Sequence, residues 1–322
     1  MLAARAARIN PDDPASALSL DDIAVPLPDP GWSRVQVRAA SLNHHDLFTL
    51  RGIGIDEARL PITLGCDASG IDDTGREVVV HGVIGDPAAG GGDETLDPKR
   101  SLLSEMHNGT FAEYVVVPTR NLLPKPTSLS FEEAACLPVA WLTAYRMLAS
   151  RSGLAPGQTV LIQGSAGGVA TAAIVLARAM GLRVWCTSRT EEKRAFALGL
   201  GAHAVFESGA RLPHRVDAVI ETVGEATWSH SLRSLRPGGR IVISGATSGA
   251  MPPADLSRVF FLQLEVVGST MGTIGELASL MSLLEVSGGR PVIDRVLPLD
   301  RAADAISAMV AGDVMGKIVL TP

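Results

Sequence analysis

The sequence contains few cysteines and few aromatic residues. Its three cysteines, Cys66, Cys136 and Cys186, are scattered among 322 residues and include no C-x-x-C pair. This spacing excludes a disulfide framework and a paired redox motif, so we expect a reduced, cytoplasmic protein. Aromatic residues make up 4% of the chain, so each one is of interest as a core or pocket residue.

Long apolar runs and an excess of positive charge are also missing. No uninterrupted apolar run reaches the roughly 18 residues of a membrane span, and residues 1–8 lack the apolar segment of a signal peptide. The net charge of −6 gives no electrostatic footprint for nucleic acid. We therefore expect neither nucleic acid nor a membrane as a partner. A chain of this length that is 46% hydrophobic is expected to fold into two domains.

A glycine-rich turn in the middle of the chain predicts a nucleotide site. A short β-branched run at 159–162 leads into the glycines, and the apolar residues that follow recur at helical spacing up to Gly181. A second strand is expected at 183–188. The turn and the helix N-terminus of such a βαβ unit suit a pyrophosphate, with a plain structural turn as the alternative. The predicted contacts are Gly164, Ser165, Ala166, Gly167, Gly168 and Val169.

The residues after the second strand favour NADP(H) over NAD(H). An NAD site usually places an acidic residue there for the ribose hydroxyls. This chain has Ser188, Arg189 and Lys193 instead, whose hydroxyl, guanidinium and ammonium suit a 2′-phosphate. The alternative is that Arg189 and Lys193 are ordinary solvated charges at the start of a helix.

The remaining pattern predicts an α/β fold with a doubly wound parallel sheet. Strands and helices alternate from residue 139 to residue 287, which predicts a six-stranded Rossmann domain. Residues 1–138 are β-rich, with a loop expected at 85–100, a capping box at Ser130 and Glu133, and a helix that stops at Pro138 and resumes. The tail, 288–322, is expected to return to the first domain.

Several motifs resemble the medium-chain dehydrogenase/reductase superfamily, in its zinc-free, quinone-oxidoreductase-like branch. They include Ser41-Leu-Asn-His-His-Asp46, Gly65-Cys-Asp67, Ala135-Cys-Leu-Pro138, Glu221-Thr-Val-Gly224 and Gly316-Lys-Ile-Val319. The resemblance implies a GroES-like catalytic domain that the C-terminal tail completes, a homodimer paired through the edge strand at 264–269, and a redox reaction with NADPH.

The departures from the zinc-dependent branch argue against a catalytic zinc. Asn43 and Cys66 stand where that branch has a cysteine and a histidine ligand, and the third ligand position corresponds to about Val139. These side chains do not make the three-ligand site that a catalytic zinc needs, so no metal is expected. An improvised site from His44, His45 and Cys66 is the alternative, although its spacing follows no ligand pattern.

Hydride transfer without a Lewis acid favours a quinone or an α,β-unsaturated carbonyl, because charge delocalises onto oxygen. The resemblance implies that Asn43 lies beside the nicotinamide and the substrate. His45 and His44 are the candidate proton donors because imidazole titrates near working pH, with structural roles for both histidines as the alternative. Asp46 is expected only to orient the loop. It also implies further cofactor contacts, each of which has packing or a turn as its alternative: Thr143, Val223, Gly224, Ser244, Gly245, Ser269, Thr270, Met271 and Lys317. An alcohol or aldehyde dehydrogenase, or a non-catalytic NADPH-binding sensor, remains open.

Overall fold

The computed structural model describes residues 1–322, which form two compact units. Unit 1 comprises residues 1–140, 273–285 and 290–322, and unit 2 comprises residues 141–272 and 286–289. None of the helices has both the length and the apolar composition of a membrane span.

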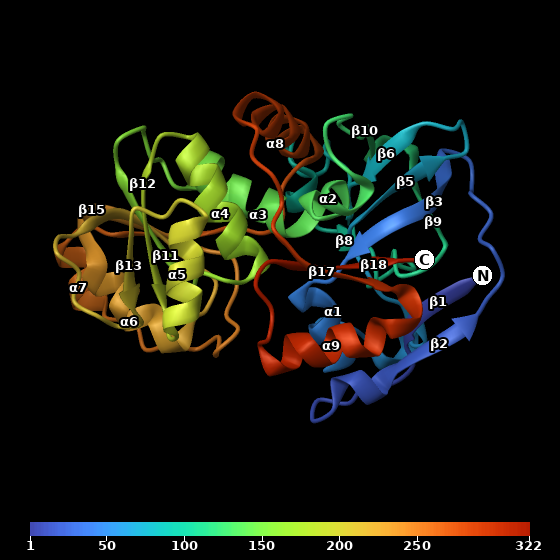
Figure 1. The fold of residues 1–322 in the computed structure, drawn as a ribbon, viewed down its shortest axis with the longest axis horizontal. Helices are drawn as coiled ribbons and strands as arrows, with labels where there is room; N and C mark the ends of the chain where they lie inside the picture. The colour runs from blue at the N-terminus through green and yellow to red at the C-terminus, as the bar shows by residue number, and fades with distance from the viewer. The chain divides into compact units, whose positions relative to one another are not determined.

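Unit 2 contains the predicted doubly wound sheet (Figure 1). All its strands are parallel, in the order β13-β12-β11-β14-β15-β16, so the order reverses between β11 and β14. The strands are β11 (Thr159–Gln163), β12 (Arg183–Ser188), β13 (Ala204–Glu207), β14 (Val216–Glu221), β15 (Leu235–Ile243) and β16 (Glu265–Gly268). The helices are α3 (Leu142–Tyr145), α4 (Gly168–Ala179), α5 (Glu191–Gly199), α6 (Glu225–Ser234) and α7 (Leu256–Phe261). Ligands of such sheets bind where the order reverses, at the carboxyl ends of the strands.

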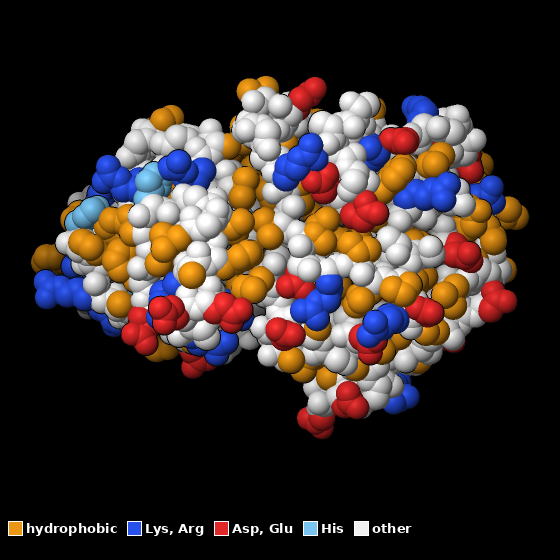
Figure 2. All heavy atoms as spheres, in the orientation of Figure 1, with side chains coloured by type: hydrophobic (Ala, Val, Ile, Leu, Met, Phe, Trp, Pro, Cys, Tyr) orange, Lys and Arg blue, Asp and Glu red, His pale blue; other side chains and the backbone are white.

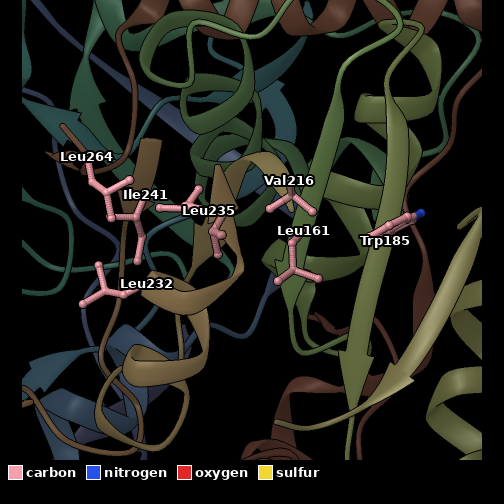
Figure 3. Packing of buried hydrophobic residues seen from close by; sticks show 8 residues of the cluster. Leu161, Trp185, Val216, Leu232, Leu235, Ile241 and Leu264 are labelled. Carbon is pink, nitrogen blue, oxygen red and sulfur yellow. The ribbon is translucent and has the colours of Figure 1, made fainter. Parts of the chain in front are cut away.

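Aliphatic side chains fill the core of unit 2 (Figure 3). Leu161 of β11 and Val219 of β14 are fully buried, and Leu232 of α6 packs into the same cluster. Burial of each such side chain stabilises the fold by about 1.5–3 kcal/mol relative to its exposure. Each of three helices packs on the two strands that flank it in the sequence: α4 contacts β11 and β12, α5 contacts β12 and β13, and α6 contacts β14 and β15.

Unit 1 is built on a mostly antiparallel sheet that the C-terminal tail completes, as predicted. The order is β10-β6-β5-β3-β18-β17, with β9 also paired to β3. These strands are β3 (Trp32–Ser41), β5 (Ala68–Asp72), β6 (Glu77–Val80), β9 (Tyr114–Pro118), β10 (Leu122–Pro124), β17 (Ile293–Pro298) and β18 (Lys317–Thr321). Short strands β1 (Leu2–Ala6), β2 (Leu18–Asp22), β4 (Ile62–Thr63), β7 (Val83–Ile84) and β8 (Ser101–Leu102) form two further sheets. The helices are α1 (His44–Leu50), α2 (Phe131–Ala135), α8 (Ile274–Ser287) and α9 (Ala302–Ala311).

Helix α8 lies in a different unit from the one expected. The sequence pattern placed residues 274–286 at the end of the Rossmann domain, whereas residues 273–285 cluster with unit 1. Glu94 connects the start of α8 to unit 1, because its carboxylate accepts a hydrogen bond from Ile274 N at 2.6 Å. Glu94 is itself buried beside His81, with Nε2 and Oε1 3.4 Å apart. The loop expected at 85–100 therefore contains a buried anchor as well as turns.

The helix after Ser130 is longer than expected. Ser130 and Glu133 form the predicted capping box, with Ser130 N donating to Glu133 Oε2 and Glu133 N donating to Ser130 Oγ. The chain then stays helical through Pro138, because a π-helical segment at Leu137–Trp141 joins α2 to α3. The wider π-helical turn accommodates Pro138, so the helix is not broken there as it usually is at a proline.

The visible surface carries both signs of charge. Figure 2 shows Asp and Glu side chains among Lys and Arg over both units on this face. Large apolar side chains are exposed beside the edge strand β16: Phe261 of α7 is 79% exposed, and Val266 of β16 is 47% exposed.

Candidate functional site

The glycine turn of unit 2 combines a glycine of positive φ with open space at the start of a helix. Gly164 has φ +83°, a conformation that side chains with a Cβ rarely adopt. Gly167 has an ordinary backbone conformation, yet a Cβ built there meets nothing within 4 Å, so open space lies beside it. Gly168 and Val169 begin α4, where the first backbone N–H groups have no partner within the helix. The turn therefore offers open space and N–H donors together, which fits an anionic group.

Two other residues of the turn are engaged in packing. Ser165 is buried, and its Oγ donates to Lys193 O at 3.0 Å, which ties the turn to the first turn of α5. Ala166 is 6% exposed. Of the predicted pyrophosphate contacts, only Gly167 and the N-terminal residues of α4 border open space.

The rim after β12 brings cationic side chains to the carboxyl edge of the sheet. Ser188 ends β12 and is buried, Arg189 is exposed, and Lys193 lies in the first turn of α5, which Thr190 caps. Arg194 was not predicted, although its Nη1 donates to Ser188 O at 3.0 Å. The rim therefore holds three basic residues on consecutive elements, and no acidic residue occupies the end of β12.

A buried polar network under this edge was not predicted either. Glu221, at the end of β14, is fully buried and accepts hydrogen bonds from Val223 N (2.8 Å), Gly224 N (3.1 Å), Thr227 Oγ1 (2.8 Å) and Ser231 Oγ (2.6 Å). The network continues to the neighbouring strands, because Gln163 Nε2 donates to Ser231 Oγ and Thr187 Oγ1 donates to Gln163 Oε1. It fixes the loop after β14 relative to β11 and β12.

That loop lies beside the glycine turn. A Cβ built on Gly164 would be 3.9 Å from Val223 Cγ2. Gly224 has φ +91° and has no room for a side chain, because a Cβ there would meet Gly249 O at 2.4 Å. The structure therefore brings together the glycine turn and the Val223–Gly224 pair that was predicted to contact the ribose.

The remaining predicted contacts of unit 2 lie on the same sheet edge or on α3. Ser244 N donates to Glu221 O, and Gly245 lies against Thr222. Ser269 N donates to Ile243 O, while the Oγ of Ser269 is buried without a hydrogen-bond partner. The other predicted contacts are the exposed Thr270, Met271 with φ +48°, and the buried Thr143 of α3.

In unit 1, Asp46 holds the start of α1 in place. Its carboxylate is fully buried and accepts from Asn43 N and from Gly65 N, both at 2.8 Å. Burial raises the pKa of Asp46, and His45, these two backbone hydrogen bonds and Lys317 act in the opposite direction. Because both oxygens bond to backbone, Asp46 joins the Asn43 loop to the Gly65 loop.

Asn43 lies in a second buried cluster with Asp67 and Lys317. Lys317 Nζ donates to Asn43 Oδ1 and to Leu42 O, both at 2.5 Å, and lies 3.9 Å from Asp67 Oδ2. Asn43 Nδ2 donates to Asp67 Oδ2 at 3.0 Å and to Ser41 O at 3.1 Å. Burial raises the pKa of Asp67 to about 6, against the ammonium of Lys317 and the hydrogen bonds from Asn43 and Ser41. The Lys317 side chain predicted to reach the cofactor is thus buried and bonded to Asn43.

The two histidines differ in their surroundings. His45 Nε2 is 3.1 Å from Ser104 Oγ and 3.9 Å from Glu105 Oε1, so it has polar partners for proton exchange. His44 is at the surface, and its ring packs near Phe48 with centroids 6.2 Å apart. Desolvation by the surrounding protein lowers the pKa of His44, and the charges of Lys317 and Arg51 lower it further. His45 therefore has polar side-chain partners, whereas His44 packs near an aromatic ring.

These residues do not fit a catalytic zinc. Cys66 is fully buried, and it is the one soft donor among the residues at the three ligand positions. Asn43 directs its amide oxygen to the ammonium of Lys317. A fixed cation beside the donor atoms would repel a divalent metal ion, and Val139 offers no ligand atom.

Both units match known sequence families. Residues 29–127 match the family described as alcohol dehydrogenase GroES-like domain, and residues 168–286 match the family described as zinc-binding dehydrogenase.

Individual proteins are similar over nearly the whole chain. A human protein named quinone oxidoreductase is 28% identical, with 93% of this chain and 92% of that protein covered. The crystal structure of an NAD-dependent alcohol dehydrogenase superposes with a TM-score of 0.91 at 33% identity, over 100% of both chains. A 2-octenoyl-CoA carboxylase reductase, in complex with NADP and 2-octenoyl-CoA, superposes with a TM-score of 0.91 at 26% identity, over 99% of this chain and 87% of the other. With its doubly wound sheet, its tail-completed GroES-like unit and these similarities, the chain belongs to the medium-chain dehydrogenase/reductase superfamily of oxidoreductases.

Proposed function

We propose that this protein is an NADPH-dependent reductase of quinones or α,β-unsaturated carbonyl compounds and works without a metal ion. The observation that carries the proposal is the cluster of Asn43, Asp67 and Lys317, in which a lysine ammonium stands beside the position of a zinc ligand in the zinc-dependent branch. Conjugated acceptors suit such a site because they delocalise the charge that a Lewis acid would otherwise stabilise. The quinone oxidoreductase and the enoyl-CoA-binding reductase among the similar proteins support the same acceptor class.

In this proposal one set of residues binds NADPH and another set supplies the proton. Gly167 and the N-terminus of α4 hold the pyrophosphate, and Arg189 with Lys193 holds the 2′-phosphate. When bound, NADPH supplies a hydride from the nicotinamide. His45 gives a proton to the reduced product, and Ser104 and Glu105 orient the ring of His45.

We predict that Arg189→Ala lowers the affinity for NADPH about 10- to 100-fold and leaves the affinity for NADH unchanged, because a charge-assisted hydrogen bond to the 2′-phosphate contributes about 1.5–3 kcal/mol. Titration of the intrinsic tryptophan fluorescence with each cofactor measures both affinities. Arg183→Ala is the matched control, since Arg183 is exposed at the opposite end of the same strand. An unchanged preference in Arg189→Ala would remove Arg189 from the cofactor site.

We also predict that His45→Asn lowers kcat about 100-fold, the lower part of the range for loss of a general acid. The affinity for NADPH should not change, because the proposal places His45 at the substrate and not at the cofactor. His44→Asn is the control, and we expect it to lower kcat only slightly. Equal losses in both variants would contradict the assignment of His45.

A substrate panel tests the proposed function as a whole. We expect oxidation of NADPH by 1,4-benzoquinone and by an enone such as 2-cyclohexenone, with no reduction of NADP+ by a primary alcohol. Metal analysis of the active protein should find much less than one zinc per chain. Activity confined to the alcohol, together with about one zinc per chain, would overturn the proposal.

A second candidate is an alcohol dehydrogenase, which the 33% identity to an NAD-dependent alcohol dehydrogenase favours. It predicts turnover of the alcohol and a preference for NAD+, so the same panel separates the two. Tight cofactor binding with no turnover of any compound would instead favour the sensor protein. For the assembly we propose a homodimer paired through the edge strand β16, because Val266 of β16 and Phe261 of the preceding helix α7 are both exposed.

A further inference from the structure

The strand pairing of unit 1 sets Lys317 opposite Asn43. Strands β18 and β3 are antiparallel, with Val319 opposite Ser41 and Leu320 opposite Ala40. Leu42 N also donates to Ile318 O, so the pairing continues past the end of β3. Counted two residues on from the Val319–Ser41 pair, this antiparallel register places Lys317 opposite Asn43. Its ammonium therefore reaches Asn43 because of the backbone geometry and not because of a flexible loop.

Gly316 makes this placement possible. It has φ +116°, and a Cβ there would meet Val292 O at 2.4 Å. Lys317 N donates to the same Val292 O at 2.9 Å. The chain therefore passes close to β17 immediately before Lys317, and the lysine enters the sheet with its side chain 3% exposed.

The partners of Asn43 determine which way its amide points. Lys317 can only donate, so it must face the amide oxygen of Asn43. Ser41 O can only accept, so it must face the amide nitrogen, and Asp67 Oδ2 accepts from the same nitrogen. Both N–H groups of Asn43 are therefore bonded inside unit 1, and none is left to polarise a substrate carbonyl.

We propose that Lys317 is a positioning residue of the reducing site: its ammonium is the site's fixed positive charge and locks the amide of Asn43 in this single orientation. The inference rests on the proposed function, and it changes two assignments within it. Lys317 acts through Asn43 and not by contact with the cofactor. The amide of Asn43, with its oxygen on Lys317 and its nitrogen on Ser41 O and Asp67, offers the substrate no free N–H donor. A fixed ammonium in a dry site stabilises nearby negative charge without reorganisation, as a preorganised dipole or metal ion does.

Lys317→Met removes the charge and keeps the length of the side chain. We expect kcat for quinone reduction to fall about 10-fold or more, by comparison with loss of other preorganised electrostatic groups. The dissociation constant of NADPH should stay within about twofold of the wild-type value, since the lost interaction acts on the reaction and not on binding. Lys125→Met is the matched control: Lys125 is a similarly buried lysine of unit 1 that donates to Leu129 O and pairs with Glu77. It should lower the melting temperature without lowering kcat.

A double variant separates positioning from stability. Lys317→Met alone leaves Asp67 buried beside no cation, which destabilises the fold. Lys317→Met with Asp67→Asn removes both charges, so we expect the melting temperature to recover in part while kcat stays low. The recovery is partial because the new amide keeps one acceptor oxygen for the donor groups of Ser41 and Asn43. Recovery of kcat together with the melting temperature would show a merely structural role and overturn the proposal. A parallel loss of NADPH affinity in Lys317→Met would also overturn it and make Lys317 a direct cofactor contact.

The side-chain amide of Asn43 provides a readout that needs no turnover. In nitrogen-15 NMR spectra, its two N–H protons should exchange slowly with water in the wild-type protein. Exchange should be faster in Lys317→Met, where the amide oxygen loses its donor, and faster still in the double variant, which also removes the Asp67 carboxylate. If the wild-type protein turns over none of the panel compounds, the proposed function fails while this readout still decides the positioning. Unchanged protection of the amide in the folded double variant would refute the lock.

Discussion

A Gly167→Val variant is expected to fold with an unchanged melting temperature and to bind NADPH at least about 100-fold more weakly, a loss of about 2.7 kcal/mol. The backbone of Gly167, with φ −71° and ψ 165°, suits a β-branched residue, and a Cβ there meets no other atom of the protein. The added side chain would instead fill the space in which we place the pyrophosphate. Fluorescence titration with NADPH and thermal unfolding measure the two quantities.

Two glycines serve as controls for this prediction. Gly199 of α5 also has open space at its Cβ and lies away from the turn, so Gly199→Val should leave NADPH binding unchanged. Gly164→Val should lower the melting temperature as well as the affinity, because Val at φ +83° is strained. Wild-type affinity in Gly167→Val would place the cofactor elsewhere and would remove the main support for the nucleotide site.

Replacement of Glu221 by Ala is expected to destabilise unit 2 by about 3 kcal/mol or more, because each buried donor left without an acceptor costs about 1–3 kcal/mol. Four donor groups bond to this carboxylate, including the N–H groups of Val223 and Gly224. The loop after β14 should lose its fixed position, and we expect weaker NADPH binding in the fraction that stays folded. Urea unfolding followed by tryptophan fluorescence gives the stability, since Trp185 and Trp228 lie in unit 2.

Glu207→Ala is the control for Glu221→Ala. Glu207 ends the edge strand β13 of the same sheet and is exposed, so its replacement should change stability little. Glu221→Gln should fall between the wild type and Glu221→Ala, because it keeps one acceptor oxygen and adds N–H donors that face other donors. If Glu221→Ala lowers the free energy of unfolding no more than Glu207→Ala does, water must replace the carboxylate. The hydrogen-bond network would then have no part in fixing the loop after β14.

The fold was predictable because its signals are local. Strand β12 occupies the residues expected from β-branched content, 183–188, and Gly164 and Gly181 mark turns that need positive φ. Departures occurred where tertiary contacts override local preference. Residues 236–239, Arg-Pro-Gly-Gly, have the composition of a turn, yet β15 runs through them with a register shift against β14. Pro138 likewise lies inside a π-helical segment.

The candidate site was predictable only in part. The glycine turn and the cationic rim were found because each is a short run of residues with a recognisable spacing. The Lys317–Asn43 bond joins residues 274 positions apart, and its existence depends on the register between β18 and β3. The Glu221 network similarly depends on which side chains of α6 face β14. Composition and periodicity carry no information on such pairings, so these contacts emerged only from the structure.

The position of β18 between β3 and β17 also has a consequence for biosynthesis. Strand β18 completes the sheet of unit 1, and it follows its partner β3 in the chain with the whole of unit 2 between them. Unit 2 is almost continuous in the chain and can fold while the ribosome is still translating the tail. Unit 1 cannot complete its sheet until β18 has been made. Each newly made molecule therefore passes through a stage in which unit 2 is complete and the sheet of unit 1 is not.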